Sequence, residues 1–192
     1  IPAWKLAPAL AAGNTVVWKP ASDTPLLSVA IAHLLHDAGV PAGVLNLILG
    51  PGSMGGAMVA DERVDGVTFT GSVPVGQRIR DVVTARNGRV QLELGGHNPC
   101  IVFGDADLDL AVAGAVGGAM SATGQKCTAT RRVIAVGDIH DELLDRMASA
   151  VEALRVGDGR EEGTEIGPLV SSGARAEVAE AADAALAEGA EA

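Results

Sequence analysis

Aromatic residues are nearly absent from this sequence: they make up 2% of it, and it contains no tyrosine. A core must therefore be built from Ala, Val, Leu and Ile, which suits the tight packing of an α/β fold better than a β-sandwich with bulky aromatic side chains. Long hydrophobic runs are absent too. No uninterrupted apolar stretch approaches the roughly 18 residues that a membrane span needs, so we expect no membrane partner.

Basic residues are also scarce. The sequence has 14 Lys and Arg against 24 Asp and Glu, which gives a net charge of −10. This balance argues against a nucleic-acid partner, because phosphates are neutralised by a basic face. An acidic surface is an ordinary way for a protein to stay in solution.

Only two cysteines are present, Cys100 and Cys127, which is too few for a disulfide framework and does not match zinc-binding spacing. No secretory signal opens the chain, so a reducing cytoplasm is the expected compartment. His33 and His36 lie three residues apart on a predicted helix, and no third ligand type clusters near them. We therefore predict no metal site.

The length of 192 residues, of which 48% are apolar, allows one full domain or parts of two. The chain opens at Ile1 without an initiator Met. It closes inside an Ala- and Glu-rich helical pattern that runs from residue 174 to residue 192 with no stop signal. We therefore expect a fragment of a longer protein.

Apolar runs alternate with helical patterns along the chain. Strands are predicted at residues 14–19, 44–49, 64–69, 89–94, 99–103 and 133–136. Helices are predicted at residues 24–38, 53–60, 73–86, 107–122 and 140–154, with a polar loop at 123–130. This alternation predicts βαβ units and a doubly wound parallel sheet. The change of character after Gly95-Gly96 predicts a domain boundary near Gly95.

Two predicted strand-to-helix turns could approach a phosphate. The first runs from Gly50 to Gly56, where glycines let the backbone come close to an anion at a helix N-terminus, although a merely tight turn is an equally good interpretation. The second is Thr70-Gly71-Ser72. We expect both at the carboxyl ends of neighbouring parallel strands, where open α/β sheets bind ligands, and this favours a cofactor site.

Glu93 and Cys127 have surroundings that suit catalysis. Glu93 stands among apolar neighbours at a predicted strand end; in water it is an ordinary surface carboxylate, whereas burial would make it a stronger base. Cys127 lies in a polar segment, where a thiol is as often reactive as inert. Cys100 lies in an apolar strand and is typical of a core cysteine.

These motifs, in this order, resemble the aldehyde dehydrogenase superfamily over nearly the whole chain. The resemblance is carried by the segment from Trp4 to Thr15, Lys19-Pro20, Phe69-Thr70-Gly71-Ser72, Glu93-Leu94-Gly95-Gly96 and Gly124-Gln125-Lys126-Cys127. The stretch from Gly124 to Val133 is most similar to 2-oxoglutarate semialdehyde dehydrogenases. The resemblance implies part of a Rossmann-like cofactor-binding domain over residues 1–95, followed by the truncated first part of an α/β catalytic domain over residues 96–192.

The resemblance also implies a reaction, the oxidation of an aldehyde to the carboxylic acid with NAD(P)+. Cys127 would attack the carbonyl carbon to give a thiohemiacetal, hydride would leave for C4 of the nicotinamide, and a thioester would result. Glu93 would activate the water that hydrolyses the thioester. Succinate semialdehyde or another small aldehyde is the alternative substrate, and the presence of Glu93 disfavours a CoA-acylating reaction.

A set of cofactor contacts follows from the same resemblance. Lys19 would hold the adenosine ribose, Gly52 and Gly56 would lie near the adenine and pyrophosphate, and Ser72 would contact the pyrophosphate. Leu94 and Gly95 would flank the nicotinamide. The full set comprises Lys19, Ser22, Gly52, Gly56, Phe69, Thr70, Gly71, Ser72, Leu94 and Gly95.

Ser22 bears on the choice between NAD and NADP. Many family members have Glu three residues after the equivalent of Lys19, where its carboxylate bonds the ribose hydroxyls and would repel the 2′-phosphate of NADP. Ser22 lacks that charge, so we expect NADP to be tolerated or preferred. Alternatively, Ser22 only caps the following helix, which Asp23 or Thr24 could also cap.

Some of the family's catalytic groups would lie outside this chain. An oxyanion-hole Asn would precede residue 1, and a Glu that contacts the nicotinamide ribose would follow residue 192, so we expect no turnover by these residues alone. The parent protein should be an enzyme and a homo-oligomer, either a dimer or a tetramer. A protein of another class, a silent dinucleotide-binding or structural protein, would be expected to have lost Cys127 or Glu93.

Overall fold

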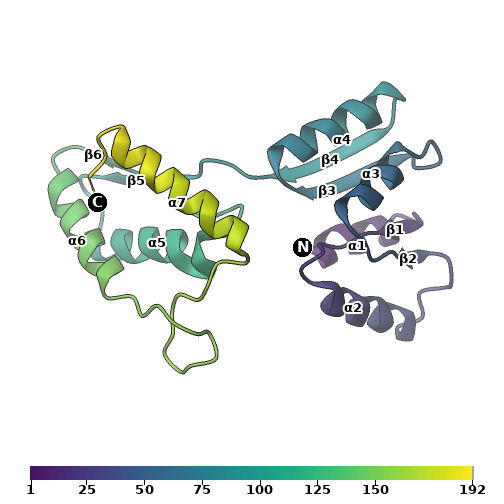
Figure 1. Cartoon of the computed structure of the whole chain (residues 1–192), viewed down its shortest axis with the longest axis horizontal. Coiled ribbons are helices and arrows are strands. Elements are labelled where there is room, and N and C mark those ends of the chain that lie inside the picture. The colour runs from purple at the N-terminus through teal and green to yellow at the C-terminus, as the bar shows by residue number, and fades with distance from the viewer. Residues whose placement is uncertain (192) are drawn as a thin grey trace. The chain divides into compact units, whose positions relative to one another are not determined.

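The computed structural model describes residues 1–191 and forms two compact units, Ile1–Gly95 and Gly96–Ala192. Figure 1 draws the first unit in purple to teal and the second in teal to yellow. Each unit combines short parallel strands with helices. Ala192, at the end of the predicted C-terminal helical pattern, lies outside the described residues.

The first unit alternates helices and strands. In chain order it comprises α1 (Pro2–Ala11), β1 (Val16–Trp18), α2 (Pro25–Asp37), β2 (Leu45–Leu47), α3 (Gly52–Ala60), β3 (Gly66–Gly71), α4 (Val73–Ala85) and β4 (Arg89–Leu94). β1 pairs with β2 and β3 pairs with β4, both in parallel. Helix α4 lies along β3 and β4 (Figure 1) and buries Ile79 and Val83. These two residues are four apart, so they share the face of the helix that the sheet covers.

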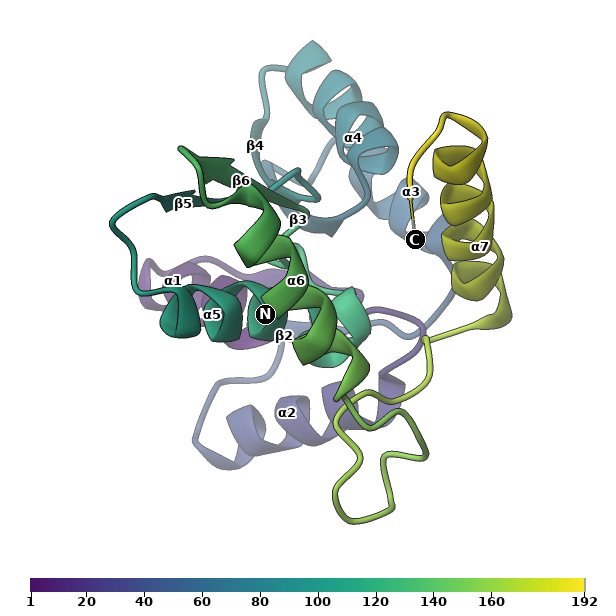
Figure 2. The ribbon, with the colours of Figure 1, turned by 90° about the vertical axis from the view of Figure 1, so that its left-hand side faces the viewer.

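The second unit is built around one parallel pair of strands. It comprises β5 (Pro99–Phe103), α5 (Leu108–Met120), the short 3₁₀ helix η1 (Ser121–Gly124), β6 (Arg132–Val136), α6 (His140–Glu152) and α7 (Ser172–Ala187). Helices α5 and α6 contact each other (Figure 2) and enclose a buried cluster of Val102, Val112, Val116 and Leu143. The alternation of a strand puts Ile101 and Phe103 on the other face of β5, and both are exposed.

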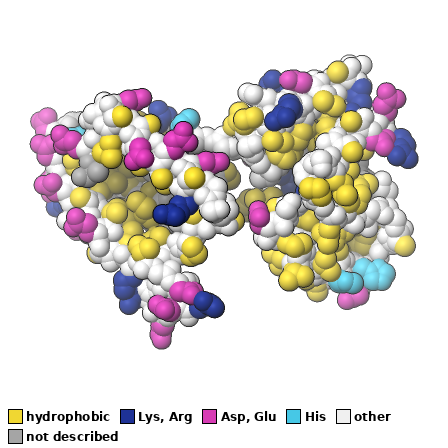
Figure 3. All heavy atoms as spheres, viewed as in Figure 1, with side chains coloured by type: hydrophobic (Ala, Val, Ile, Leu, Met, Phe, Trp, Pro, Cys, Tyr) yellow, Lys and Arg dark blue, Asp and Glu magenta, His cyan; other side chains and the backbone are white. Residues whose placement is uncertain are grey.

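Apolar side chains remain at the surface of each unit (Figure 3). On α2, Leu26 is 84% exposed and Leu34 is 67% exposed. On the open face of the second unit's sheet, Ile134 and Val136 of β6 join the two exposed residues of β5. Faces of this kind are usually covered by further protein.

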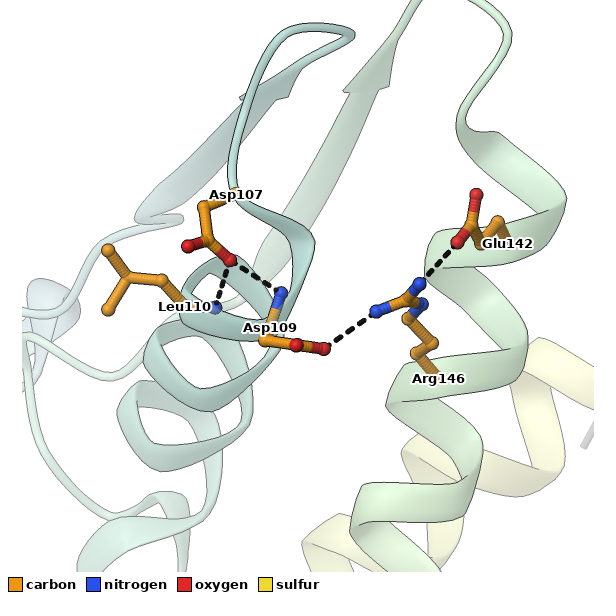
Figure 4. A network of polar contacts seen from close by, with 5 residues as sticks. All are labelled: Asp107, Asp109, Leu110, Glu142 and Arg146. Atoms are coloured by element: carbon orange, nitrogen blue, oxygen red, sulfur yellow. Dashed lines mark hydrogen bonds and ion pairs between the residues drawn. The ribbon is translucent and has the colours of Figure 1, made fainter.

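A polar network fixes the start of α5 (Figure 4). The Asp107 side chain accepts hydrogen bonds from the backbone N–H groups of Asp109 and Leu110, each at 3.1 Å, and so caps the helix. Arg146 of α6 bridges Asp109, at 2.6 Å, and Glu142 of its own helix. The two carboxylates raise the pKa of Arg146 above its ordinary value, and the larger effect comes from the hydrogen bond to Glu142. The ion pairs are solvent-exposed, so we assign most of the stabilisation to the cap.

The predicted α/β fold with parallel strands is confirmed, since every strand pair in residues 1–191 is parallel. The strands form three two-stranded sheets in place of one continuous ladder. β1 and β2 are each three residues long, so they offer few N–H and C=O groups with which to extend a ladder. The sequence pattern predicts that the two glycine-containing turns follow neighbouring strands, and the strands concerned are β2 and β3. This prediction is wrong, because β2 and β3 are not hydrogen-bonded to each other: β2 pairs with β1, and β3 pairs with β4.

Two helices differ from what the sequence pattern predicts. No helix is predicted at residues 2–11, yet α1 forms there with Pro2 in its first turn and Pro8 inside it. Pro2 suits a first turn, because the N–H groups there have no partner within the helix. Pro8 is disfavoured inside a helix, because it lacks the N–H group, and the sequence pattern therefore does not indicate a helix here. The C-terminal pattern extends to residue 192, but α7 ends at Ala187, and Gly189 then adopts a φ of +95°. None of the helices within residues 1–191 is long and apolar enough to cross a membrane.

Candidate active site

The two cysteines lie in contrasting environments in the second unit. Cys127 is exposed, in the irregular segment that joins η1 to β6. Cys100 is half-buried on β5 and packs against the buried cluster around Val102. An accessible thiol in a polar loop can attack a substrate, whereas a thiol packed into a core behaves as a small hydrophobic group.

The backbone just before Cys127 is held in a costly conformation. Ala122, Thr123 and Gly124 have φ values of +51°, +57° and +67°. For the two residues with side chains this left-handed region costs about 1 kcal/mol each, a strain that often accompanies functional sites. Hydrogen bonds to the 167–170 segment hold it: Thr123 Oγ1 donates to the Gly167 carbonyl at 3.3 Å, and Gln125 Oε1 accepts from the Val170 N–H at 2.9 Å.

Asn98 ties the cysteine loop to the start of β5. Its side-chain Nδ2 donates to the carbonyl oxygens of Cys127 at 2.7 Å and Ala129 at 2.9 Å. Its own carbonyl accepts from the N–H groups of Arg131 and Arg132. The sequence motifs give Asn98 no role, and the only signal available was its position before Pro99, which favours extended backbone.

Glu93 lies on the exposed side of β4 and not in a buried pocket. Its carboxylate accepts a hydrogen bond from Gln91 Nε2 at 2.6 Å. Gln91 Oε1 in turn accepts from Lys5 Nζ and from Thr68 Oγ1. Of the two interpretations of Glu93, the structure therefore supports the solvated strand-end carboxylate. Gln91 could have been found from the sequence, because residues 89, 91 and 93 share one face of the strand.

Ser22 lines a cavity of about 260 Å³ in the first unit, whose other lining residues are Pro20, Ala21, Pro25, Leu49, Gly50 and Pro51. Lys19 Nζ donates to the carbonyls of two of these residues, Pro20 at 2.7 Å and Gly50 at 3.3 Å. The ammonium group therefore lies at the edge of the cavity. The N-cap position of α2 is Thr24, so the alternative that Ser22 caps this helix is wrong.

The predicted phosphate-binding turns leave groups free to contact a ligand. A Cβ added at Gly52 or at Gly56 would have no atom of another part of residues 1–191 within 4 Å. The packing of the chain itself therefore does not require glycine at these two positions. Ser72 is the exposed N-cap residue of α4, and its side chain makes no capping hydrogen bond. Its hydroxyl and the first N–H groups of α4 can therefore bind an anion.

The other predicted cofactor residues cluster around the ends of β3 and β4. A Cβ at Gly71 would lie 2.4 Å from Cζ of Phe69, so any side chain at position 71 would require that ring to move. Thr70 Oγ1 is buried and has no hydrogen-bond partner among residues 1–191, and Thr70 lies opposite Glu93 in the ladder. Leu94 packs on the first turn of α4, where a Cβ at Gly76 would lie 2.5 Å from Cδ2 of Leu94. Gly95 is exposed.

The first unit thus contains Glu93 and every residue assigned to the cofactor, and the second contains Cys127. The structure brings Glu93 next to Thr70 and places Lys19 beside the cavity that Ser22 lines. Over residues 1–191, no group of three or more His, Cys, Asp or Glu side chains is arranged to hold a metal ion.

Comparison with known proteins identifies the family. The sequence model of the aldehyde dehydrogenase family matches residues 1–192. The chain belongs to the aldehyde dehydrogenase family. Among curated relatives, it is 45% identical over 172 residues to the alpha-ketoglutaric semialdehyde dehydrogenase of Bacillus subtilis (strain 168), covering 89% of this chain and 35% of that protein.

Solved structures of aldehyde dehydrogenases and related enzymes share the fold. The betaine aldehyde dehydrogenase of Staphylococcus aureus in complex with NAD+ superposes with a TM-score of 0.93 at 39% identity, over 97% of this chain and 37% of that one. An NADP-dependent enzyme of Escherichia coli gives a TM-score of 0.92 at 41% identity, over 97% and 39%. The cofactor class of these relatives is thus NAD or NADP. The chain spans 35% to 39% of the length of the curated relatives that it matches.

Proposed function

We propose that the full-length enzyme carrying this chain oxidises an aldehyde to the carboxylic acid with NAD(P)+, with Cys127 as nucleophile. The observation that carries the proposal is the environment of Cys127 in a chain of this family. The thiol is exposed, and its loop is fixed by hydrogen bonds from outside the loop, whereas Cys100 is packed into the core. A nucleophile needs both access and a fixed position.

The chain's own residues supply two roles in the reaction. The thiolate of Cys127 adds to the aldehyde carbon, and the tetrahedral thiohemiacetal becomes a thioester when the carbon loses hydride. Glu93 then takes a proton from water, and the resulting hydroxide attacks the thioester and releases the acid and the thiol. The exposure of Glu93 and its hydrogen bond to Gln91 support a carboxylate that is accessible to water and held in one orientation.

The residues of the first unit fit a dinucleotide, which supplies the hydride acceptor when it is bound. Lys19 and Ser22, at the mainly apolar cavity, would hold the adenosine. Gly52, Gly56 and the uncapped start of α4 at Ser72 would face the phosphates. The region of Phe69, Thr70, Gly71, Leu94 and Gly95 would receive the nicotinamide end, and the buried, unpartnered hydroxyl of Thr70 supports a polar ligand group there.

A semialdehyde such as 2-oxoglutarate semialdehyde is the substrate that we favour. The support is the 45% identity to a Bacillus enzyme of that name and the Gly124–Val133 segment around the nucleophile. Betaine aldehyde is the second candidate, because enzymes named for it match nearly as well, at 42% identity in one case. We further propose a homo-oligomer located in the cytoplasm, with residues 1–95 as the cofactor-binding domain and 96–192 as the first part of the catalytic domain.

The two cysteines provide a matched test. In the full-length enzyme, Cys127→Ala should abolish aldehyde oxidation and leave the cofactor Kd nearly unchanged, while Cys100→Ala should lower the rate only mildly. Steady-state rates and cofactor titrations on both variants measure this. Substantial aldehyde oxidation by the Cys127→Ala variant would rule out the proposed nucleophile.

A further inference from the structure

Asn98 holds the loop of the proposed nucleophile through both its side chain and its backbone carbonyl. One nitrogen, Nδ2, donates to the carbonyls of Cys127 and Ala129, and the backbone carbonyl of Asn98 receives the N–H groups of Arg131 and Arg132. The segment between η1 and β6 has no helical or sheet hydrogen bonds of its own. Asn98 therefore supplies from outside what regular structure would otherwise supply.

The backbone is fixed on both sides of the Cys127 Cα, by a turn of the loop itself before it and by Asn98 after it. Before it, the Lys126 carbonyl accepts from the Ala129 N–H at 3.1 Å, which closes a tight turn over Cys127 and Thr128. After it, the Cys127 carbonyl is held at 2.7 Å by Asn98. With both peptide planes fixed, the direction of the Cα–Cβ bond, and hence the region that Sγ can reach, is restricted.

The side chain at position 98 must offer two donors. A primary amide carries two N–H bonds in one plane, and the two carbonyls use both. Aspartate of the same size would present only oxygen atoms to the carbonyl oxygens, and leucine would present no polar group. Ala129 is 2% exposed, so its carbonyl has little water to replace the lost donor.

We propose that Asn98 is a positioning residue for the nucleophile: it orients Cys127 for attack through its carboxamide without touching the substrate. The inference rests on the proposed function of Cys127. Removing the donors should slow the acylation step and alter the accessibility of the thiol, while cofactor binding stays the same, because the cofactor residues lie in the other unit.

The test compares Asn98→Leu and Asn98→Asp with Asn46→Leu in the full-length enzyme. Asn46 is a matched control, because its Nδ2 also donates to two carbonyls, those of Gly43 at 2.8 Å and Val16 at 3.4 Å, but in the first unit. The readouts are the rate of the first-turnover burst of reduced cofactor, the cofactor Kd, and the iodoacetamide alkylation rate of Cys127 with Cys100 as internal reference. If Asn98→Leu fails to fold, Asn98→Asp carries the test.

Both Asn98 variants should show a burst about tenfold to a hundredfold slower, the cost expected of a displaced reacting group, and a changed alkylation rate at Cys127 only. Asn46→Leu should retain the wild-type burst. A wild-type burst in both Asn98 variants overturns the inference, as does an equal loss in Asn46→Leu or an equal change at Cys100. If Cys127→Ala itself kept the burst, the proposed function would fall; if it lost the burst while the Asn98 variants kept theirs, only this inference would.

Discussion

At the scale of single residues, we propose that the side chain at position 22 sets the choice between NAD and NADP. It lines the cavity beside Lys19, and it does not cap α2. A glutamate at this position would place a negative charge where the 2′-phosphate of NADP would lie. Two unit charges about 4 Å apart repel by about 4 kcal/mol at an effective dielectric near 20, before screening and rearrangement reduce it. Ser22 removes this repulsion and leaves the Lys19 ammonium nearby as a cation for the phosphate.

We therefore predict that the full-length enzyme uses NADP at least as well as NAD, and that Ser22→Glu shifts the preference toward NAD. The measurement is kcat/KM with each cofactor for both proteins. A wild-type preference for NAD of about a hundredfold or more, equivalent to about 2.7 kcal/mol, would contradict the role of Ser22.

The sequence predicts a residue's role only where its neighbours in the chain decide it. The contrast between Cys127 and Cys100 follows from polar and apolar neighbours and agrees with their exposure. The exposure of Glu93 depends on what packs over β4, so the local sequence left it open. Asn98 acts on a residue whose distance in the chain gives no local signal, because it contacts Cys127, 29 positions away. Gln91, by contrast, contacts Glu93 two positions away on the same face of the strand.

At the scale of elements, the N-termini of α4 and α5 differ in a way that suggests different uses. The Asp107 side chain bonds two N–H groups at the start of α5, whereas Ser72 makes no such bond at the start of α4. Free N–H groups and the positive end of a helix attract anions. The N-terminus of α4 can therefore bind an anion, whereas the N–H groups at the start of α5 are already bonded to Asp107.

This contrast predicts opposite outcomes for two alanine substitutions in the full-length enzyme. Asp107→Ala should lower the free energy of unfolding by about 1 kcal/mol and leave the cofactor Kd unchanged, because the lost cap lies in the second unit, to which no cofactor residue is assigned. Ser72→Ala should leave stability unchanged and weaken cofactor binding by about tenfold, through loss of a hydrogen bond to a charged phosphate. Denaturant titration and cofactor titration of each variant test the pair; equal effects of both substitutions on stability would contradict it.

Most elements follow from local pattern, and the exceptions have physical causes. The bounds of β4 and β5 agree with the sequence pattern, since each is an apolar alternation or run bounded by turn residues. Helix α1 escapes detection because of Pro8. The sequence pattern extends the helix to residue 122, whereas α5 ends at Met120. Ala122 and Thr123 adopt left-handed backbone conformations there, held by hydrogen bonds to the 167–170 segment that the local sequence does not reveal.

At the scale of the whole molecule, the described residues leave much apolar surface open. Exposed side chains include Leu26 and Leu34 on α2, and Ile101 and Phe103 on β5. The chain spans little more than a third of the length of its relatives, so further protein is available in those relatives to cover the corresponding faces.

We predict that the isolated 192 residues aggregate or bind a hydrophobic dye strongly, and show no aldehyde oxidation. Loss of a single oxyanion-hole donor typically costs about 10²–10³ in rate, and the resemblance assigns no side chain of residues 1–192 to that role. Light scattering, dye binding and a cofactor-reduction assay test this. A monodisperse preparation that melts cooperatively and turns over aldehyde would show that these residues suffice.

In the proposed reaction Cys127 carries the acyl group and Glu93 drives its hydrolysis. Glu93→Gln removes the proton acceptor with little change of shape, and Glu62→Gln serves as the control at an exposed carboxylate outside the site. The decisive measurement is the mass of the Cys127 peptide from the full-length Glu93→Gln enzyme, quenched after one turnover with aldehyde and cofactor. We predict a trapped thioester on that peptide, and none in the wild type or in Glu62→Gln. Normal steady-state turnover by Glu93→Gln, or an acyl group found on Cys100, would contradict the account.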